Sequence, residues 1–269
     1  MSDQDVLNLV KPEIGGGRIP KEKIDEIASS SLRRLKVSGL RQDTFDYLVD
    51  TYGDRFKEID FLKCPHVEDL SSLSRLESIE SITFYWNQSA NTLWDMSANR
   101  RLKKLSFLDF EKLRKIDDLA TASAVEDIHF GTAVWPKMVV ESLRPLSAVS
   151  TLKKLHFYPK KIADCCVEPL TQIPNLTELG FPTILFSTEQ VAWLTARLRG
   201  RVRSTVLCAV RKIDRPLLRK GKRLDSLIIG KRKQMLDSEL DSGRIQRYID
   251  KFNELTEHYA NTADASEPV

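Results

Sequence analysis

One pattern of apolar positions recurs along most of the chain: apolar, two variable residues, apolar, one variable residue, then an aromatic or aliphatic residue. It occurs as LRRLKV, FKEIDF, IESITF, LKKLSF, VEDIHF, LKKLHF and LTELGF, which begin at residues 32, 56, 79, 102, 125, 152 and 176. The starts therefore lie 24, 23, 23, 23, 27 and 24 residues apart. A period of this length, kept through seven segments, indicates internal repeats that are each one supersecondary unit long.

The fourth and sixth residues of each hexapeptide predict a buried side of a short strand, because side chains alternate across a strand. The fourth residue is always Leu or Ile, and the sixth is Phe in six of the seven hexapeptides. We expect these residues to form the interior beneath a parallel sheet, with the phenylalanines in one column. The pairs are Leu35 and Val37, Ile59 and Phe61, Ile82 and Phe84, Leu105 and Phe107, Ile128 and Phe130, Leu155 and Phe157, and Leu179 and Phe181.

The segments between the hexapeptides are compatible with helical turns that return the chain to the next strand. In the segment 67–78, Leu70, Leu73 and Leu76 fall on one side of such a turn. Burying three large apolar side chains stabilises one unit by roughly 5–9 kcal/mol. Ordering a backbone of about 23 residues costs roughly 23–46 kcal/mol. One unit therefore cannot fold alone, and the units must stack as in a solenoid.

The repeat resembles the leucine-rich repeat family, whose units read LxxLxLxx(N/C)xL, and the resemblance covers residues 32–200. It implies an α/β solenoid with a curved, parallel, concave β-sheet, a helical or irregular convex side and helical caps. The Asn or Cys of the family's ninth position is present only as Cys64 and Asn87. The other repeats hold Leu40, Phe110, Ala133, Lys160 and Ile184 there, so their turns must be held differently. This departure from the ninth-position pattern suggests a divergent, bacterial-type member of the family.

The remaining segments frame the seven repeats of residues 32–200. We expect flexible tails at 1–18 and 261–269, and an N-terminal cap helix at 19–31 that begins at Pro20 and turns Ile24 and Ile27 toward the first repeat. Residues 201–234 are interpreted as a basic, degenerate repeat or C-terminal cap. Residues 235–260 carry apolar side chains at helical spacing and predict an amphipathic C-terminal helix.

In such a solenoid the third, fifth and seventh positions of each unit face outward on the concave side. The seventh positions predict an apolar and aromatic stripe, which is typical of protein-binding surfaces unless the rings fold back over the loops. Trp86, Trp94 and Trp135 in the following loops would extend it. The third positions alternate in charge, so neighbouring strands can pair charges. The candidate partner-binding residues are Leu62, Tyr85, Leu108, Tyr158, Lys104, Lys154, Asp60, His129 and His156.

Residues 197–233 form a strongly basic segment, with fourteen Lys and Arg against Asp214 and Asp225, a net charge of +12. The whole chain carries +4, so the rest of the chain carries −8. Three interpretations stay open: a cap whose arginine stems cover the core, a site for an acidic protein surface, or a nucleic-acid site. The candidate anion-binding residues are Arg211, Lys212, Arg219, Lys220, Lys222 and Arg223.

Catalytic and metal chemistry find little support in the sequence. His129 and His156 would lie on adjacent strands, but no HxH or HExxH spacing accompanies them, so we expect surface histidines and neither a metal nor another cofactor. There is no GxSxG motif, and the glycines at 15–17 precede the repeats. The four cysteines show no CxxC spacing and are expected to be reduced, buried thiols. We therefore expect no enzymatic activity.

The sequence thus supports two functional hypotheses. The first is a non-catalytic module that grips another protein on its concave face, similar to bacterial repeat proteins that act as immunity or adaptor partners. The alternative is a nucleic-acid- or ribosome-associated protein that uses residues 197–233. The chain has neither an apolar run of membrane-spanning length nor a signal-peptide pattern. We therefore expect a cytoplasmic protein without a membrane partner, either monomeric or in a complex with another protein.

Overall fold

The computed structural model describes residues 5–134, 137–219, 221–231, 234–262 and 265–268. Trp135 and Lys220, both singled out by the sequence, lie outside the described residues. The chain divides into two compact units. The first comprises Met1–Ala163 and Ile173–Asn175, and the second comprises Asp164–Gln172 and Leu176–Val269.

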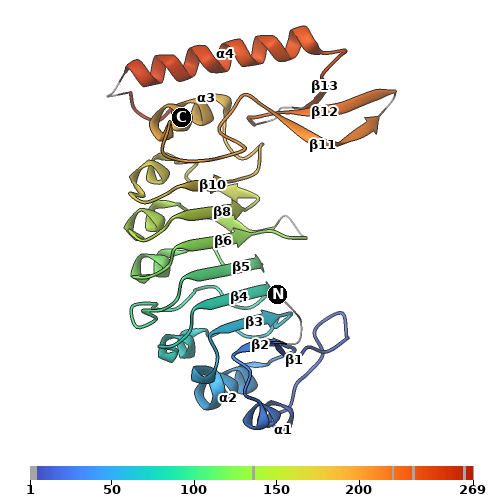
Figure 1. The fold of residues 1–269 in the computed structure, drawn as a ribbon, viewed down its shortest axis with the longest axis vertical. Helices are drawn as coiled ribbons and strands as arrows, with labels where there is room; N and C mark the ends of the chain where they lie inside the picture. Colours follow the sequence, from blue (N-terminus) through green and yellow to red (C-terminus); the bar gives the residue numbers. More distant parts are fainter. Residues whose placement is uncertain (1–4, 135–136, 220, 232–233, 263–264, 269) are drawn as a thin grey trace. The chain divides into compact units, whose positions relative to one another are not determined.

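A parallel sheet runs through the first unit. Its strands, in spatial order, are β1 (Leu7–Leu9), β2 (Arg34–Ser38), β3 (Glu58–Leu62), β4 (Ser81–Asn87), β5 (Lys104–Phe110), β6 (Asp127–Gly131) and β8 (Lys154–Tyr158). The hexapeptides pair in the predicted register, so that Phe84 lies opposite both Phe61 and Phe107. Figure 1 shows these strands side by side, with the returning turns along the edge where the strands begin. The predicted parallel arrangement of the first six repeats is confirmed.

The fourth and sixth positions of the repeats form the core of the first unit. Every one of them, from Leu35 to Phe157, is at most 1% exposed. The ring centroids of Phe61 and Phe84 lie 4.7 Å apart, and those of Phe107 and Phe130 lie 5.1 Å apart, both in stacked geometry. Phe110 meets Phe84 and Phe107 edge-on, at 5.7 and 6.0 Å. The predicted phenylalanine column is therefore present, and Phe110 adds to it.

Most of the returning segments are short 3-10 helices. The first return is an α-helix, α2 (Gln42–Tyr52), followed by η3 (Gly53–Arg55). The later ones are η4 (Ser71–Arg75), η5 (Asp117–Thr121) and η6 (Arg144–Ala148). The buried residues Leu70, Leu73 and Leu76 are spaced by three, which matches the three residues per turn of a 3-10 helix. In α2 the buried Phe45, Leu48 and Val49 instead follow the α-helical spacing. Two further strands, β7 (Val139–Val140) and β9 (Lys161–Ile162), pair in parallel beside the returns.

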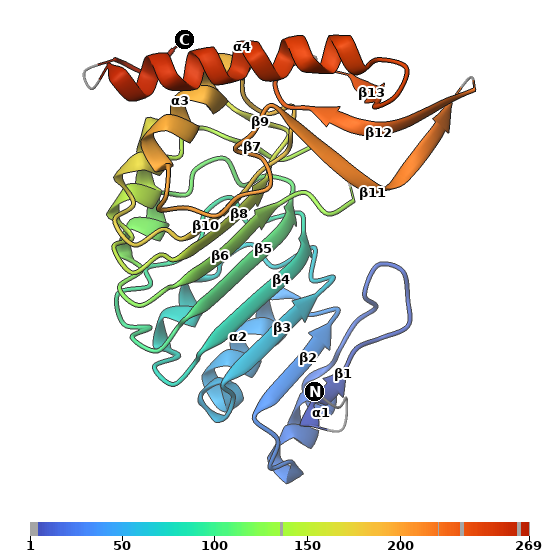
Figure 2. The ribbon, with the colours of Figure 1, turned by 45° about the horizontal axis from the view of Figure 1, so that its top comes forward.

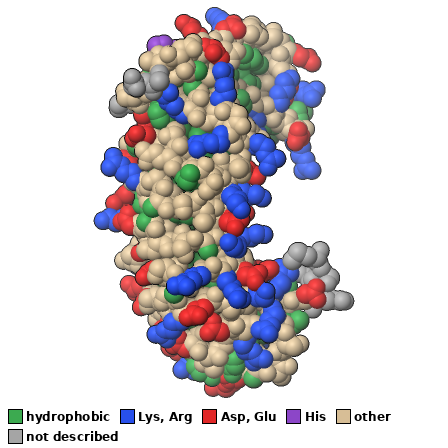
Figure 3. All heavy atoms as spheres, turned by 60° about the vertical axis from the view of Figure 1, so that its left-hand side comes forward, with side chains coloured by type: hydrophobic (Ala, Val, Ile, Leu, Met, Phe, Trp, Pro, Cys, Tyr) green, Lys and Arg blue, Asp and Glu red, His purple; other side chains and the backbone are tan. Residues whose placement is uncertain are grey.

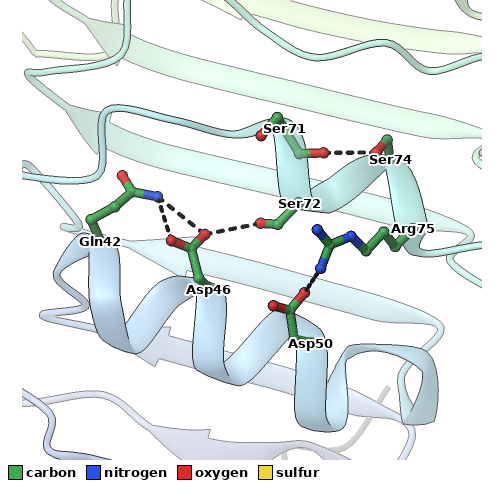
Figure 4. Close-up of polar contacts among 7 residues, drawn as sticks. All are labelled: Gln42, Asp46, Asp50, Ser71, Ser72, Ser74 and Arg75. Carbon is green, nitrogen blue, oxygen red and sulfur yellow. Dashed lines mark hydrogen bonds and ion pairs between the residues drawn. The ribbon is translucent and has the colours of Figure 1, made fainter.

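Polar side chains join the first two returns to each other (Figure 4). The Gln42 amide oxygen accepts hydrogen bonds from the backbone N–H groups of Glu68 and Asp69, at 2.9 and 3.0 Å. Asp46 accepts a hydrogen bond of 3.2 Å from the Ser72 hydroxyl, and Arg75 forms an ion pair with Asp50. The Gln42 side chain thus satisfies two backbone N–H groups just before η4, and the side chains of Asp46 and Asp50 add polar contacts between α2 and η4.

The chain leaves several strands through a left-handed residue at the eighth position of the repeat. The φ angles are +69° at Gly39, +53° at Lys63, +65° at Trp86 and +55° at Asp109. The next position then points inward, which explains why Leu40, Cys64 and Phe110 are buried there. Asn87 holds its turn as in the family pattern. Its amide nitrogen donates to the carbonyl of Val67 (2.8 Å), and its amide oxygen accepts from the N–H of Ala90 (2.8 Å).

The prediction of a flexible tail at 1–18 is wrong for the described residues 5–18. Strand β1 pairs in parallel with β2, and Leu9 is only 5% exposed. Gly16 (φ +88°) packs so closely that a Cβ atom there would lie 2.2 Å from the carbonyl oxygen of Lys63. Gly16 is therefore a packing residue, because only glycine fits this approach, whereas nothing lies within 4 Å of a Cβ atom at Gly15. The cap helix predicted at 19–31 is limited to α1 (Lys21–Ile24) and the 3-10 helix η2 (Asp25–Ser29), with Ile24 and Ile27 buried as expected.

The second unit contains η7 (Glu168–Gln172), β10 (Glu178–Gly180), α3 (Thr188–Leu198), β11 (Val210–Arg219), β12 (Lys222–Ile228), β13 (Met235–Asp237) and α4 (Ser242–Asn261). The strand of the seventh repeat is β10, with Leu179 and Phe181 both 2% exposed. Helix α3 begins with a capping box in which Ser187 and Gln190 exchange hydrogen bonds of 3.1 Å. In the described part of the chain, no helix is both long and apolar enough to cross a bilayer.

The basic segment of the second unit is not a further repeat. Strands β11, β12 and β13 form an antiparallel sheet in that order, with Leu217 opposite Leu224 and Leu227 opposite Met235. A parallel repeat needs a helical return between strands, whereas only two residues separate β11 from β12. The amphipathic helix predicted at 235–260 begins only at Ser242, because residues 235–237 are used as β13. It buries Phe252 and Thr256.

The prediction of a flexible tail at 261–269 is also wrong for its described residues. The carboxylate of Glu267 accepts hydrogen bonds from the N–H groups of Val167 (2.8 Å) and Glu168 (2.9 Å) and from the thiol of Cys166 (3.2 Å). The indole N–H of Trp193 donates to the carbonyl of Ala265 (3.0 Å). The C-terminal residues thus dock on the second unit. Of the thiols predicted to be mostly buried, Cys64 is buried, whereas Cys165, Cys166 and Cys208 are half-buried.

Because Glu267 contacts the thiol of Cys166, we expect substitution of Glu267 to change the reactivity of that thiol. Burial, together with the hydrogen bond and negative charge of Glu267, raises the pKa of Cys166 to about 11. In a Cys165→Ser background, Glu267→Gln removes the charge, so the pKa of Cys166 should fall and its alkylation by iodoacetamide at mildly alkaline pH should accelerate. The rate rises about tenfold for each unit of pKa lost, because the thiolate is the nucleophile. Peptide mass spectrometry measures it, with Cys208 as the internal reference; an unchanged rate at Cys166 would contradict the docked position.

Candidate protein-binding face of the sheet

The third, fifth and seventh positions of strands β2 to β8 in the first unit lie on the side of the sheet opposite to the core. We call this side the open face. The paired registers bring Leu62, Tyr85 and Leu108 next to one another, and His129 next to His156. All nine partner-binding candidates therefore lie on one face of one sheet.

The apolar stripe of the open face is half-buried. Leu62, Tyr85, Leu108 and Tyr158 are each of intermediate exposure, so they keep part of their surface for a partner. Gly131 interrupts the stripe between Leu108 and Tyr158, and its φ is +126°. A Cβ atom at Gly131 would lie 2.4 Å from the carbonyl carbon of Tyr158, so no larger side chain fits there. The stripe therefore consists of two parts.

His129, His156 and Tyr158 form an aromatic cluster at the second part of the stripe. The Tyr158 ring meets the His129 ring edge-on at 5.6 Å, and the two imidazole rings lie 6.3 Å apart. The Tyr158 hydroxyl lies 3.4 Å from Nδ1 of His156. Burial lowers the pKa of His129, and the neighbouring His156 lowers it further against the opposing effect of Asp127. The His129 side chain is therefore neutral at neutral pH, and the cluster presents aromatic surface with hydrogen-bonding atoms.

Charged residues flank the aromatic cluster. Lys104 and Lys154 are exposed, and neither makes an ion pair among the described residues. The predicted pairing of third-position charges is confirmed for Arg34 and Glu58, whose side chains lie 2.7 Å apart. Burial raises the pKa of Asp60, against the hydrogen bond from Thr83. Asp127 lies between the two lysines in the strand register but forms an ion pair with neither, so both lysines stay exposed beside the cluster.

The second position of the repeats carries a charge ladder that the sequence analysis missed. Lys57 pairs with Glu80 at 2.6 Å, and Glu126 pairs with Lys103 at 3.0 Å and with Lys153 at 2.7 Å. Figure 3 shows acidic and basic side chains interleaved over the side of the first unit where the strands begin. The alternating Lys and Glu at intervals of one repeat were the available signal. These surface pairs each contribute about 0–1 kcal/mol and neutralise one another, which sets this side apart from Lys104 and Lys154.

The tryptophans do not extend the stripe as predicted. Trp94 is 2% exposed and donates from its indole N–H to Asn99, at 2.8 Å, so it belongs to the core. Trp86 is half-buried and lines a pocket of about 270 Å³ beyond the ends of β4 and β5. The pocket also contains Asp109, whose carboxylate accepts a hydrogen bond from the N–H of Ala133 at 2.9 Å. That carboxylate therefore supports a turn.

The candidate anion-binding residues lie on the hairpin of the second unit. Arg211, Lys212 and Arg219 belong to β11, Lys222 and Arg223 belong to β12, and all five are exposed. Lys222 lies 3.5 Å from Asp241, whereas the other four make no ion pair among the described residues. The hairpin thus concentrates positive charge that the described chain does not neutralise.

No family model matches the chain, and no curated protein matches it. Among solved structures, the chain is similar to an internalin (inlF) from Listeria monocytogenes str. 4b F2365. The identity is 12% and the TM-score 0.40, and the match covers 72% of this chain and 66% of that one, just under two thirds. The description of the fold therefore depends on the strand register and the core of this chain itself.

Proposed function

We propose that the chain is a divergent member of the leucine-rich repeat family and that it binds another protein through the open face of its sheet. The observation that supports this most strongly is the half-buried cluster of His129, His156 and Tyr158. Aromatic side chains on a rigid sheet lose little conformational freedom when a partner covers them, so they contribute much of the affinity in protein interfaces.

The residues beside the cluster indicate the chemistry of the partner. Lys104 and Lys154 would face carboxylates, because neither has an ion-pair partner among the described residues. Tyr85 and Leu108 would cover an apolar side chain. A partner surface with an apolar centre and an acidic rim complements this arrangement. The role is binding without catalysis, and the narrower role of an immunity or adaptor protein stays a prediction.

Capture of a partner tests this proposal. The purified, tagged chain is incubated with extract from its source cells, and the protein it retains is identified and then titrated. Tyr158→Ala combined with Lys154→Glu should weaken binding, so that the dissociation constant rises by about tenfold or more. Lys153→Glu is the matched control, since it changes the neighbouring residue in the charge ladder and should alter affinity by less than about twofold.

Two results would contradict the proposal. One is retention of every partner by the Tyr158→Ala, Lys154→Glu variant while its thermal unfolding stays unchanged. The other is binding of polynucleotide instead of protein at about 150 mM salt, abolished by Arg211→Glu and Lys212→Glu, which would favour the nucleic-acid alternative.

A further inference from the structure

The antiparallel sheet of the second unit bears a groove that the sequence did not indicate. It has a volume of about 530 Å³. Its apolar part comes from all three strands, with Leu217 on β11, Leu224 on β12 and Leu236 on β13. Arg219, Lys222, Gln234, Met235, Asp241 and Arg244 complete the lining. Figure 2 shows the hairpin together with β13 and the start of α4; Asp241 directly precedes α4, and Arg244 lies in its first turn.

The apolar part of the groove is open to solvent at Leu217, whereas Leu224 is half-buried and Leu236 is buried. Leu217 is 56% exposed although it is paired directly with Leu224 across the hairpin. Leu218, the next residue, is 84% exposed and does not line the groove, because consecutive side chains of a strand point to opposite faces. An exposed leucine at the centre of an apolar groove is a position that a partner side chain can cover.

Asp241 lines the groove 3.5 Å from Lys222 and offsets its charge, whereas no acidic residue in the described part of the chain makes an ion pair with Arg219. The carboxylate of Asp225 accepts hydrogen bonds from the hydroxyl and N–H of Ser238, at 2.6 and 2.9 Å. Asp237 accepts from the backbone N–H groups of Arg223 and Leu240, at 2.9 and 3.0 Å. Both carboxylates therefore hold turns and strands. Among the described residues Arg219 makes no ion pair, so its charge is available to an anionic ligand.

Aromatic residues are missing where a nucleic-acid surface would use them. Residues 204–247 of the sequence contain no Phe, Tyr or Trp, so the hairpin has no ring on which bases could stack. A polynucleotide would also leave the leucines of the groove without an apolar partner. The groove instead combines leucine side chains with cationic side chains. This combination fits a peptide chain that carries both carboxylates and aliphatic side chains.

We infer that this groove binds an acidic, amphipathic peptide segment of another protein. Aliphatic side chains of the segment cover Leu217 and Leu224, and its carboxylates face Arg219. Charge complementarity speeds the encounter, and the leucine contact slows dissociation. This surface is separate from the open face, and its residues lie wholly in the second unit.

Fluorescence anisotropy with a labelled peptide of alternating Glu and Leu tests the inference on the full chain. Leu217→Gln should weaken binding about tenfold, whereas Leu218→Gln should change it less than about twofold. Arg219→Gln should weaken binding and reduce its salt dependence more than Arg215→Gln, which changes an exposed cation outside the groove. Urea unfolding of each variant verifies that the fold is kept, since all four side chains are exposed.

Four results would overturn the inference. The first is that a peptide in which Ser replaces Leu binds as tightly, which would show that charge alone causes the binding. Leu218→Gln could weaken binding as much as Leu217→Gln does. Oligothymidylate could bind more tightly than the peptide and lose that binding in Arg219→Gln, which would identify nucleic acid. Concentration-dependent self-association, lost in Leu217→Gln, would identify a second copy as the occupant. Tyr158→Ala should not affect peptide binding, so failure here is distinguishable from failure of the open-face proposal.

Discussion

Replacing Phe107 by Ala is expected to lower the free energy of unfolding by about 3–5 kcal/mol. Phe107 is fully buried, stacks on Phe130 at 5.1 Å and meets Phe110 edge-on at 6.0 Å. The neighbouring strands are fixed by hydrogen bonds in both directions, so they cannot close in to fill the space left by the ring. The variant therefore loses both the transfer free energy of the ring and the contacts of the cavity wall.

Urea unfolding followed by circular dichroism measures this loss, with Leu108→Ala as the matched control. Leu108 is the next residue of the same strand, but it is half-buried on the open face. Its truncation should cost about 1 kcal/mol, because only part of its apolar surface leaves water on folding. A loss below about 1 kcal/mol for Phe107→Ala would contradict the phenylalanine column as the centre of the core.

Gly131→Ala is expected to be the second severe substitution, although it adds a single methyl group. The φ of +126° strains any residue with a side chain, and the new Cβ would meet the carbonyl carbon and the nitrogen of Tyr158 at 2.4 and 2.6 Å. Those atoms are backbone, so relief requires β6 and β8 to separate. Backbone strain and overpacking together should lower the free energy of unfolding by about 2–6 kcal/mol.

Gly200→Ala separates the two causes. Gly200 also has a positive φ, of +76°, but nothing lies within 4 Å of the Cβ position. Its substitution should cost only the left-handed conformation, about 1–2 kcal/mol. Equal losses for the two variants, measured by urea unfolding, would show that the close approach of Tyr158 to Gly131 does not limit the sheet. Because Tyr158 belongs to the candidate binding cluster, Gly131→Ala should also weaken the binding of the partner that the open face captures.

The hexapeptide pattern was sufficient to predict strands β2 to β6 and β8 of the first unit, their register and their core, but not the edge strand β1. In a strand the side-chain period is two, so the fourth and sixth positions decide the buried face without knowledge of any neighbour. The spacing of three in Leu70, Leu73 and Leu76 likewise matches the 3-10 geometry of the return, although by itself it predicts only a turn or short helix. The open-face candidates followed from the same alternation.

Other features depend on residues that are far apart in the sequence. Gly16 gains its role only because it lies against Gly39 and Lys63. The apolar pattern of residues 204–230 fits another parallel repeat as well as the antiparallel hairpin that forms, since either uses short apolar strands. The two-residue connection between β11 and β12 decides for the hairpin. Glu267, similarly, becomes a docking residue through partners about a hundred positions earlier.

The sequence by itself thus determined which side of each strand is buried and which repeats stack, because those properties depend on local periodicity. The tertiary structure decided how the exposed side chains meet. Tyr158 lies against His129 and His156, Lys153 is paired while Lys154 is not, and Leu217 lines a groove while Leu218 does not. Adjacent residues such as Lys153 and Lys154 differ because the residues around each of them come from other strands. The contacts made in the folded chain therefore distinguish a candidate binding residue from its neighbour in the sequence.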